Sequence, residues 1–360
     1  MLISSAPGKL FIAGEYAVTH PGYPAILVAV DKFITLSIEK ALYKGSIDLG
    51  RDRPISWTRD KDEIVLDGYK HGLPHIRFAI KMVETYIQEL GKKPNFYHLK
   101  IESQLRSKEG KKYGLGSSAA LIVSLVNALC AYYEIPISPD ELFKLSSLAN
   151  LHINRASSCG DIAASVYGGW IAFTSFDRKW VLKQQKNKSI KELISTKWPG
   201  LSIEPLNPPK ELRLVVGWTG EPASTTKLLE QINQSRLKNN RAYRNFLYGS
   251  KICVNKMIKA FREADIKGIQ KQVQINRQLL IDLGKDLGVE IESLLLTKLC
   301  HIGQKYKGYG KPSGAGGGDC GILILDSDEF LPQIIEEWRE AGIMYLPLNI
   351  APGTKLPYKG

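Results

Sequence analysis

The strongest constraint on the fold of this chain is a glycine-serine loop that leads directly into an apolar helix. Residues 114–120 read Gly-Leu-Gly-Ser-Ser-Ala-Ala, and a mostly apolar run extends from Ala119 to Tyr133. Glycine lets the backbone approach a ligand, and a helix N-terminus presents free N–H groups and a positive dipole end. The pattern therefore predicts a phosphate site, with a loop that merely caps a buried helix as the alternative.

Two common nucleotide motifs do not fit this loop. No Gly-Lys-Ser/Thr sequence follows, as a Walker A loop requires. A dinucleotide fingerprint, with Ala119 in place of the third glycine, needs a strand immediately before it. Here the expected strand from Phe96 to Glu102 is separated from the glycines by a basic loop.

Three further segments contain candidate catalytic or ligand-binding residues. Residues 313–319 read Ser-Gly-Ala-Gly-Gly-Gly-Asp just before an apolar strand, which suits close backbone approach or a simple turn. Lys9 stands in Ala-Pro-Gly-Lys-Leu, although a single lysine usually lies on the surface. Asp161 follows Ser-Ser-Cys-Gly and is either a buried carboxylate or, by default, a helix N-cap.

The pattern of elements predicts an α+β fold with two subdomains. Strands are expected from the alternating runs of the first 40 residues, and a helix from the spacing of apolar residues over 75–90. A long helical region is expected over about 226–295, with breaks near Gly268 and Gly284. The lysine-rich stretch near 183–200 is the expected boundary, which divides the chain into 1–190 and 191–360.

The net charge of +13 is concentrated in two segments. Residues 227–262 carry +8 and residues 178–197 carry +6, while the rest of the chain sums to −1. Such runs are usually solvated faces, and a docking or steering surface is the alternative. A nucleic-acid-binding module would add a recognisable motif or interleaved exposed aromatic residues.

The five cysteines and the N-terminal sequence indicate in which cellular compartment the protein is expected. The cysteines are widely spaced without a Cys-x-x-Cys pair, which favours a reducing environment over a disulfide framework or a zinc site. The first 18 residues lack the basic start and apolar core of a signal peptide, and no apolar run is long enough to cross a bilayer. We expect a cytoplasmic protein with no membrane partner.

The motifs, taken in order, resemble the GHMP family of small-molecule kinases, which includes galactokinase and homoserine kinase. Three stretches carry the resemblance: APGKLFIAGEYAV, GLGSSAA and KPSGAGGGDCG. It implies a ribosomal protein S5 domain 2-like N-terminal domain, a ferredoxin-like C-terminal domain and an active site between them. Within the family, SSCGDIAASVYGGWIAF and VGWTGEPASTTKL are most similar to the bacterial-type phosphomevalonate kinases.

The resemblance implies ATP, Mg²⁺ and phosphomevalonate as ligands, and a role for each matching residue. Lys9 and Asp161 match the catalytic pair, and Ser118 matches the hydroxyl associated with the metal. The expected phosphate-binding residues are Lys112, Gly114, Leu115, Gly116, Ser117, Ser118 and Ala119. The expected acceptor-binding residues are Lys9, Tyr16, Ser158, Thr225, Ser313, Gly314 and Ala315.

One position departs from the family pattern. Mevalonate kinases hold a magnesium-binding glutamate at the position of Asn150, so the ion is expected mainly on ATP oxygens, water and Ser118. The alternatives are a mevalonate kinase, a diphosphomevalonate decarboxylase, a catalytically dead relative and a basic nucleic-acid-binding protein. A homodimer is compatible with the sequence.

Overall fold

Two long strands at the start of the chain form the spine of the first sheet. The computed structural model describes residues 1–50, 53–60, 63–68, 72–221, 228, 232 and 240–359. Strand β1 (Leu2–Ala13) pairs antiparallel with β2 (Pro24–Lys40) along almost its whole length. The apolar alternation of this stretch predicted both strands, and the burial of every residue from Pro24 to Val30 explains the continuous apolar run.

Over the part of the chain that the structure describes, the first sheet has nine strands, and β2 pairs with β1, β6 and β7. One half of β2 pairs with β6 (Tyr97–Ser103) and the other with β7 (Trp170–Thr174). The order is β13-β1-β2-β6-β3-β4-β5, and β7 carries β8 on its free side. The remaining strands are β3 (Gly45–Asp48), β4 (Ile55–Asp60), β5 (Glu63–Leu66), β8 (Ser202–Leu206) and β13 (Tyr358–Lys359).

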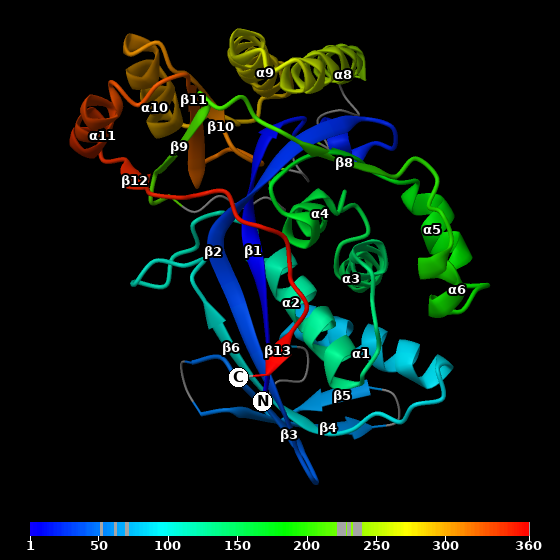
Figure 1. The fold of residues 1–360 in the computed structure, drawn as a ribbon. Helices are drawn as coiled ribbons and strands as arrows, with labels where there is room; N and C mark the ends of the chain where they lie inside the picture. Colours follow the sequence, from blue (N-terminus) through cyan, green and yellow to red (C-terminus); the bar gives the residue numbers. More distant parts are fainter. Residues whose placement is uncertain are drawn as a thin grey trace.

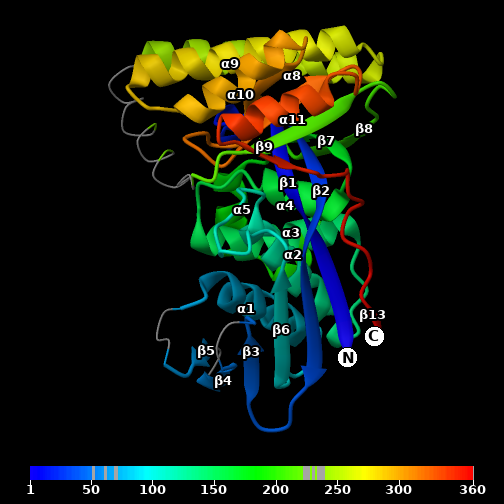
Figure 2. The ribbon, with the colours of Figure 1, turned by 90° about the vertical axis from the view of Figure 1, so that its left-hand side faces the viewer.

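Four helices lie along one side of these strands (Figures 1 and 2). They are α1 (Pro74–Glu89), α2 (Ser117–Tyr132), α3 (Pro139–Ile153) and α4 (Gly160–Tyr167). Helix α2 packs against β1 and β2, and its almost complete burial explains why its sequence is apolar on all sides. Ser138 and Glu141 form a capping box at the start of α3.

The stretch expected to separate the two domains is folded into the first one. Helices α5 (Arg178–Gln184) and α6 (Ile190–Ser195) precede β8, and β8 extends the first sheet by pairing with β7. The second sheet begins only with β9 (Arg213–Trp218). We therefore propose a boundary between 206 and 213 in place of one at 190.

The second sheet has the ferredoxin-like arrangement that the resemblance implied. Its four antiparallel strands run in the order β10-β11-β9-β12. The helices of this domain lie between the strands in sequence, so the chain order is strand, helices, two strands, helix, strand. The elements are α8 (Asn240–Arg262), α9 (Ile266–Leu287), α10 (Leu294–Lys305), β10 (Tyr309–Pro312), β11 (Cys320–Leu325), α11 (Leu331–Glu340) and β12 (Met344–Leu346).

The long helical region is interrupted close to both expected places, between α8 and α9 and again after α9, which ends at Leu287 with Gly288 as its left-handed C-cap. The chain breaks between α8 and α9, where Asp265 caps α9 by accepting a hydrogen bond from Gly268 N. Gly268 therefore lies in the first turn of α9, and Gly284 lies within the same helix. The preceding helix closes in a left-handed turn at Ala264, with φ of 51°, and the Asp265 carboxylate then satisfies a free N–H group in the first turn of α9.

The C-terminal segment returns to the first sheet. Asn349 donates to the Asp31 carboxylate through its backbone and its side chain, and β13 then pairs with β1. Both termini consequently lie side by side at one end of the molecule (Figure 1). Among the described residues, no helix is long and apolar enough to cross a bilayer. All five cysteines are buried and free.

Candidate active site

The glycine-serine loop forms the N-terminus of α2, as the sequence predicted. Gly116 is the N-cap residue in a left-handed conformation, with φ of 77°, and Ser117 begins the helix. The backbone N–H groups of Ala119 and Ala120 donate to Gly116 O. The remaining N–H groups of the first turn belong to Ser117 and Ser118, beside the positive end of the helix dipole. This geometry suits the oxygens of a phosphate chain.

Neighbouring segments hold this loop against both sheets. Lys9 N donates to Leu115 O at 2.9 Å, which fastens the loop to β1. A Cβ on Gly114, whose φ is 82°, would lie 2.6 Å from Cβ of Asp319 in the third motif. Gly114 therefore allows the glycine-rich loop of residues 313–319 to approach the glycine-serine loop of residues 114–120. The two loops, about 200 residues apart in sequence, form one site.

Lys9 lies under the phosphate loop in an environment that changes its acidity. Its side chain is almost fully buried. Burial lowers the pKa of Lys9, and the nearby carboxylates of Asp161, Asp319 and Glu15 oppose this effect. These carboxylates offset part of the penalty that burial places on the ammonium form of Lys9. This ammonium group is therefore suited to stabilise negative charge that develops near it.

Asp161 does not take the N-cap position expected of it. Cys159 is the N-cap of α4, with φ of 61°, and Asp161 lies in the first turn, where its Oδ1 accepts from Ile162 N. A carboxylate is favourable there because of the helix dipole. Asp161 is only partly buried and borders a cavity, so it is available to a ligand.

A cavity of about 160 Å³ lies beside these charged groups. Its walls come from the segment after β1, from the loop before α4 and from the third motif. It brings together five of the residues predicted to contact the acceptor or the reacting groups: Tyr16, Ser158, Asp161, Gly314 and Ala315. The other lining residues are Phe11, Glu15, Val18, Thr19, Asn154, Ala156 and Ser157.

Other predicted site residues are not among those that line this cavity. The Ser313 hydroxyl accepts from Phe11 N and donates to Phe11 O, so it joins the two sheets behind the cavity. Lys112 is exposed in the loop before the glycines. Thr225 lies outside the described residues. Asn150 donates to Ser157 Oγ at 2.9 Å and thus supports the loop that forms one cavity wall.

Two residues at the site were not predicted from the sequence. His75, at the start of α1, lies near both Lys112 and Asp161, and burial lowers the pKa of its imidazole. Arg178, in the first turn of α5, donates to the backbone oxygen of Thr19. Only the position of Arg178 in a basic segment was visible in the sequence, because its contact spans 159 residues.

Arg178 is an unusual arginine. Its Nη1 is buried, and no described residue accepts a hydrogen bond from it. Burial lowers the pKa of the guanidinium group, which stays protonated in proteins. A positive charge that is partly removed from water therefore lies directly behind Thr19, a wall of the cavity.

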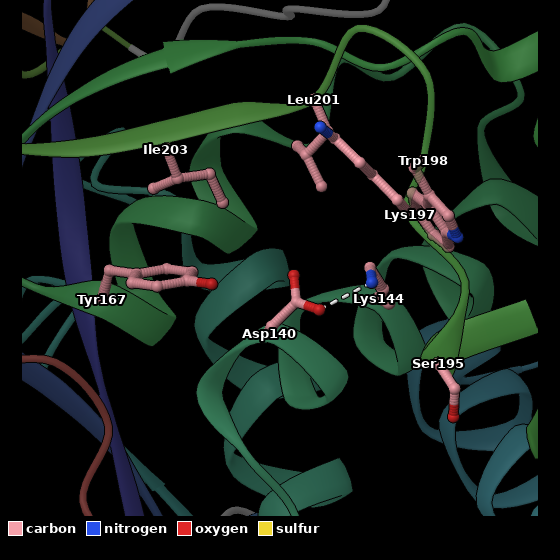
Figure 3. A pocket seen from close by; sticks show the side chains of 8 residues that line it. All are labelled: Asp140, Lys144, Tyr167, Ser195, Lys197, Trp198, Leu201 and Ile203. Carbon is pink, nitrogen blue, oxygen red and sulfur yellow. Dashed lines mark ion pairs between the residues drawn. The ribbon is translucent and has the colours of Figure 1, made fainter.

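A second cavity, of about 360 Å³, lies away from these residues, between α3, α6 and β8. Figure 3 shows Asp140 and Lys144 paired at its floor, with Tyr167 and Lys197 around them. The Lys144 ammonium group also donates to the backbone oxygens of Ile194 and Thr196. Its charge is therefore used to fasten the end of α6 to α3, and none of the predicted site residues lines this cavity.

Taken together, a helix N-terminus suited to phosphate, a buried lysine, carboxylates and a small cavity define a phosphotransferase for a small molecule. A family model described as the GHMP kinases N terminal domain matches residues 77–169, and one described as GHMP kinases C terminal matches residues 257–343. The chain belongs to the GHMP kinase family.

Several individual relatives within the family are similar to this chain over almost its whole length. The phosphomevalonate kinase of Streptomyces sp. (strain CL190) is 37% identical, over 97% of each chain. A crystal structure of the Lin0012 protein from Listeria innocua has a TM-score of 0.93 at 37% identity, covering 100% of this chain and 99% of the other. The Streptococcus pneumoniae phosphomevalonate kinase in complex with phosphomevalonate and AMPPNP has a TM-score of 0.85 at 28% identity, covering 98% and 100%.

Proposed function

We propose that this protein transfers the γ-phosphoryl group of ATP to (R)-5-phosphomevalonate, releasing ADP and 5-diphosphomevalonate, in the mevalonate route to isoprenoids. The observation that carries the proposal is full-length similarity at 37% identity to a phosphomevalonate kinase. The cavity lined by Asp161, whose carboxylate lies near Lys9, gives the acceptor a place beside the charged groups.

The nature of the acceptor limits what the protein must do. A phosphate monoester has a second pKa of about 6, so at neutral pH it is already a largely anionic nucleophile. An acceptor oxygen forms the new bond to the γ-phosphorus, and the bond from that phosphorus to the bridging oxygen breaks as ADP leaves. Positioning and charge stabilisation, rather than proton removal, are then the main requirements.

The chain's own residues meet these requirements in separate roles. The N–H groups of Ser117 and Ser118 bind the ATP phosphates at the start of α2. Lys9 stabilises the negative charge on the transferring group. Asp161 orients both Lys9 and the acceptor, and it does not serve as an obligatory base.

The residues present fit a magnesium ion carried by the nucleotide. Among the described residues, no group of three or more His, Cys, Asp or Glu is arranged to hold a metal ion. Asn150, at the position where mevalonate kinases hold a metal-binding glutamate, donates a hydrogen bond to Ser157 Oγ. Ser118 supplies a hydroxyl at the start of α2, and Mg²⁺ accepts such oxygens alongside phosphate and water. Bound Mg²⁺ would neutralise phosphate charge.

A single assay tests the proposed function. ADP release from ATP is measured with phosphomevalonate, mevalonate and diphosphomevalonate as separate acceptors. We expect turnover with phosphomevalonate and little with the other two. Preference for mevalonate would identify an alcohol phosphotransferase, and carbon dioxide release from diphosphomevalonate would identify a decarboxylase. Salt-resistant retention of nucleic acid without ADP release would contradict the proposal altogether.

A further inference from the structure

The most deeply buried ion pair of the described residues lies at the acceptor cavity. The Lys311 ammonium group, in β10, pairs with the Glu15 carboxylate, which follows β1. The two side chains are 0% and 3% exposed, and Glu15 lines the cavity. Lys311 also donates to Pro312 O, and no described residue donates to the second oxygen of Glu15.

Such a pair is a poor way to stabilise a fold. Removing two charges from water carries a free-energy penalty of several kcal/mol per ion, and well-packed apolar residues often stabilise as well or better. Removing only one partner is strongly destabilising because it leaves a buried, uncompensated charge. What a buried pair does provide is a fixed relative position of its two segments, because each charge has only one favourable location.

The two segments fixed in this way both contribute walls of the cavity. One is the turn after β1, and the other is the start of the third motif. Between them run the Lys311–Glu15 pair, the two hydrogen bonds of Ser313 with Phe11, and a hydrogen bond from the Tyr16 hydroxyl to Ala315 O. These contacts form a seam between the first and second sheets.

The turn after β1 has an unusual backbone at two of its residues. Gly14 has φ of 92°, and a Cβ there would lie 2.5 Å from Pro24 O. Tyr16 has φ of 62°, in the left-handed region that a tyrosine rarely adopts. Glu15 stands between these two residues, so its pairing with Lys311 fixes the strained turn against β10.

We infer that Glu15 and Lys311 are a positioning pair that sets the distance between the two walls of the acceptor cavity. This inference rests on the proposed function in so far as the cavity holds the acceptor. The pair acts through the placement of Tyr16 and Ala315, and not on the phosphate loop, which is fastened separately through Lys9 N and Leu115 O. Loss of the pair should therefore weaken binding of the acceptor and leave binding of ATP unchanged.

The test uses Glu15→Gln, Lys311→Met and the double variant, which carries neither charge. Each single variant should unfold at a lower temperature than the wild type, and the double variant should recover most of that loss because no uncompensated charge remains. The acceptor KM should rise about tenfold in all three, since small displacements of a binding wall are costly in rate and affinity. The KM for ATP should stay within about twofold of the wild-type value, since the phosphate loop keeps its own anchor and its helix N-terminus.

A matched control is the Arg59–Glu84 pair, whose side chains are 15% and 9% exposed at the opposite end of the first sheet. Arg59→Met, Glu84→Gln and their double variant should change the unfolding temperature in the same pattern and leave the acceptor KM unchanged. Return of the wild-type acceptor KM in the Glu15/Lys311 double variant would overturn the inference, and so would an equal rise in the KM for ATP.

The wild type in the same assay reports on the proposed function separately. Absence of ADP release with phosphomevalonate would contradict that function, and the variants would then be compared with whichever acceptor the wild type uses. An unchanged acceptor KM in the variants, with normal wild-type turnover, would contradict only the role of the pair.

Discussion

Lys9 passes directly beneath Gly116, so closely that a Cβ on that glycine would lie 2.9 Å from Lys9 Cε. The same glycine caps α2 with φ of 77°. One residue thus starts the phosphate-binding helix and leaves room for the cation beside it. This relationship couples the geometry of the phosphate site to the placement of the charge.

Gly116→Ala should therefore impair both stability and rate. The left-handed backbone alone should lower the free energy of unfolding by about 1–3 kcal/mol. Displacement of Lys9 should lower kcat about a hundredfold. Gly91→Ala is the control, because Gly91 has φ of 76° and a Cβ added there would meet no other atom within 4 Å. It should lose stability and keep its kcat; equal kcat loss in both variants would contradict this explanation.

Lys9→Met should reduce kcat more than Asp161→Asn does. Loss of the buried cation removes stabilisation of the transferring phosphoryl group, for which we expect a decrease of about a thousandfold. The acceptor needs no obligatory base, so Asp161→Asn should cost about tenfold, or about 1.4 kcal/mol. Steady-state kinetics with saturating ATP measure both, and a larger decrease for Asp161→Asn would reverse the assigned roles.

The pH profile should report the altered acidity of Lys9. Burial lowers the pKa of Lys9 from its ordinary value of 10.5, so the ammonium charge is lost at a lower pH than for an exposed lysine. As pH rises through that pKa, kcat/KM should fall. Lys9→Arg should move this alkaline limb upward, whatever its effect on rate, since arginine stays protonated. An alkaline limb that does not move would assign it to another group.

Ser118→Ala tests the hydroxyl at the start of α2. The variant should need several-fold more Mg²⁺ for half-maximal rate, and calorimetry should show a smaller gain in ATP affinity on adding Mg²⁺. Ser124→Ala is the control, since Ser124 lies within the same helix and its hydroxyl donates to Leu121 O, one turn earlier in that helix. Equal Mg²⁺ requirements for the Ser118 variant and the wild type would exclude this hydroxyl as a ligand.

Arg178→Gln should raise the acceptor KM several-fold. The guanidinium group holds Thr19 O and contributes a positive charge behind the cavity wall. Lys179→Gln removes the same charge from the exposed neighbouring position and should leave the KM unchanged. If both variants behaved alike at several salt concentrations, general steering by the basic segment would replace this local role.

Much of the site was predictable because its motifs are local. Gly114, Gly116 and the two serines predict either a phosphate loop or a loop that caps a helix, and the apolar run after them indicates the buried helix that the structure has. The Ser138–Glu141 capping box is equally local, because its two residues are only three positions apart. The N-cap at Cys159 was not predictable, because a cysteine in a left-handed conformation leaves no sequence signal, and Asp161 nearby suggested a different cap.

The sequence by itself determined the local elements, the α+β class and the order of the three motifs, since periodicity and glycine placement act over a few residues. Only the tertiary structure decided which charges meet. Lys311 and Glu15 are 296 residues apart, and Arg178 reaches Thr19 across 159. Their positions follow from how the strands pair and how the second sheet packs on the first. Burial then determines how strongly each charged group interacts with its neighbours.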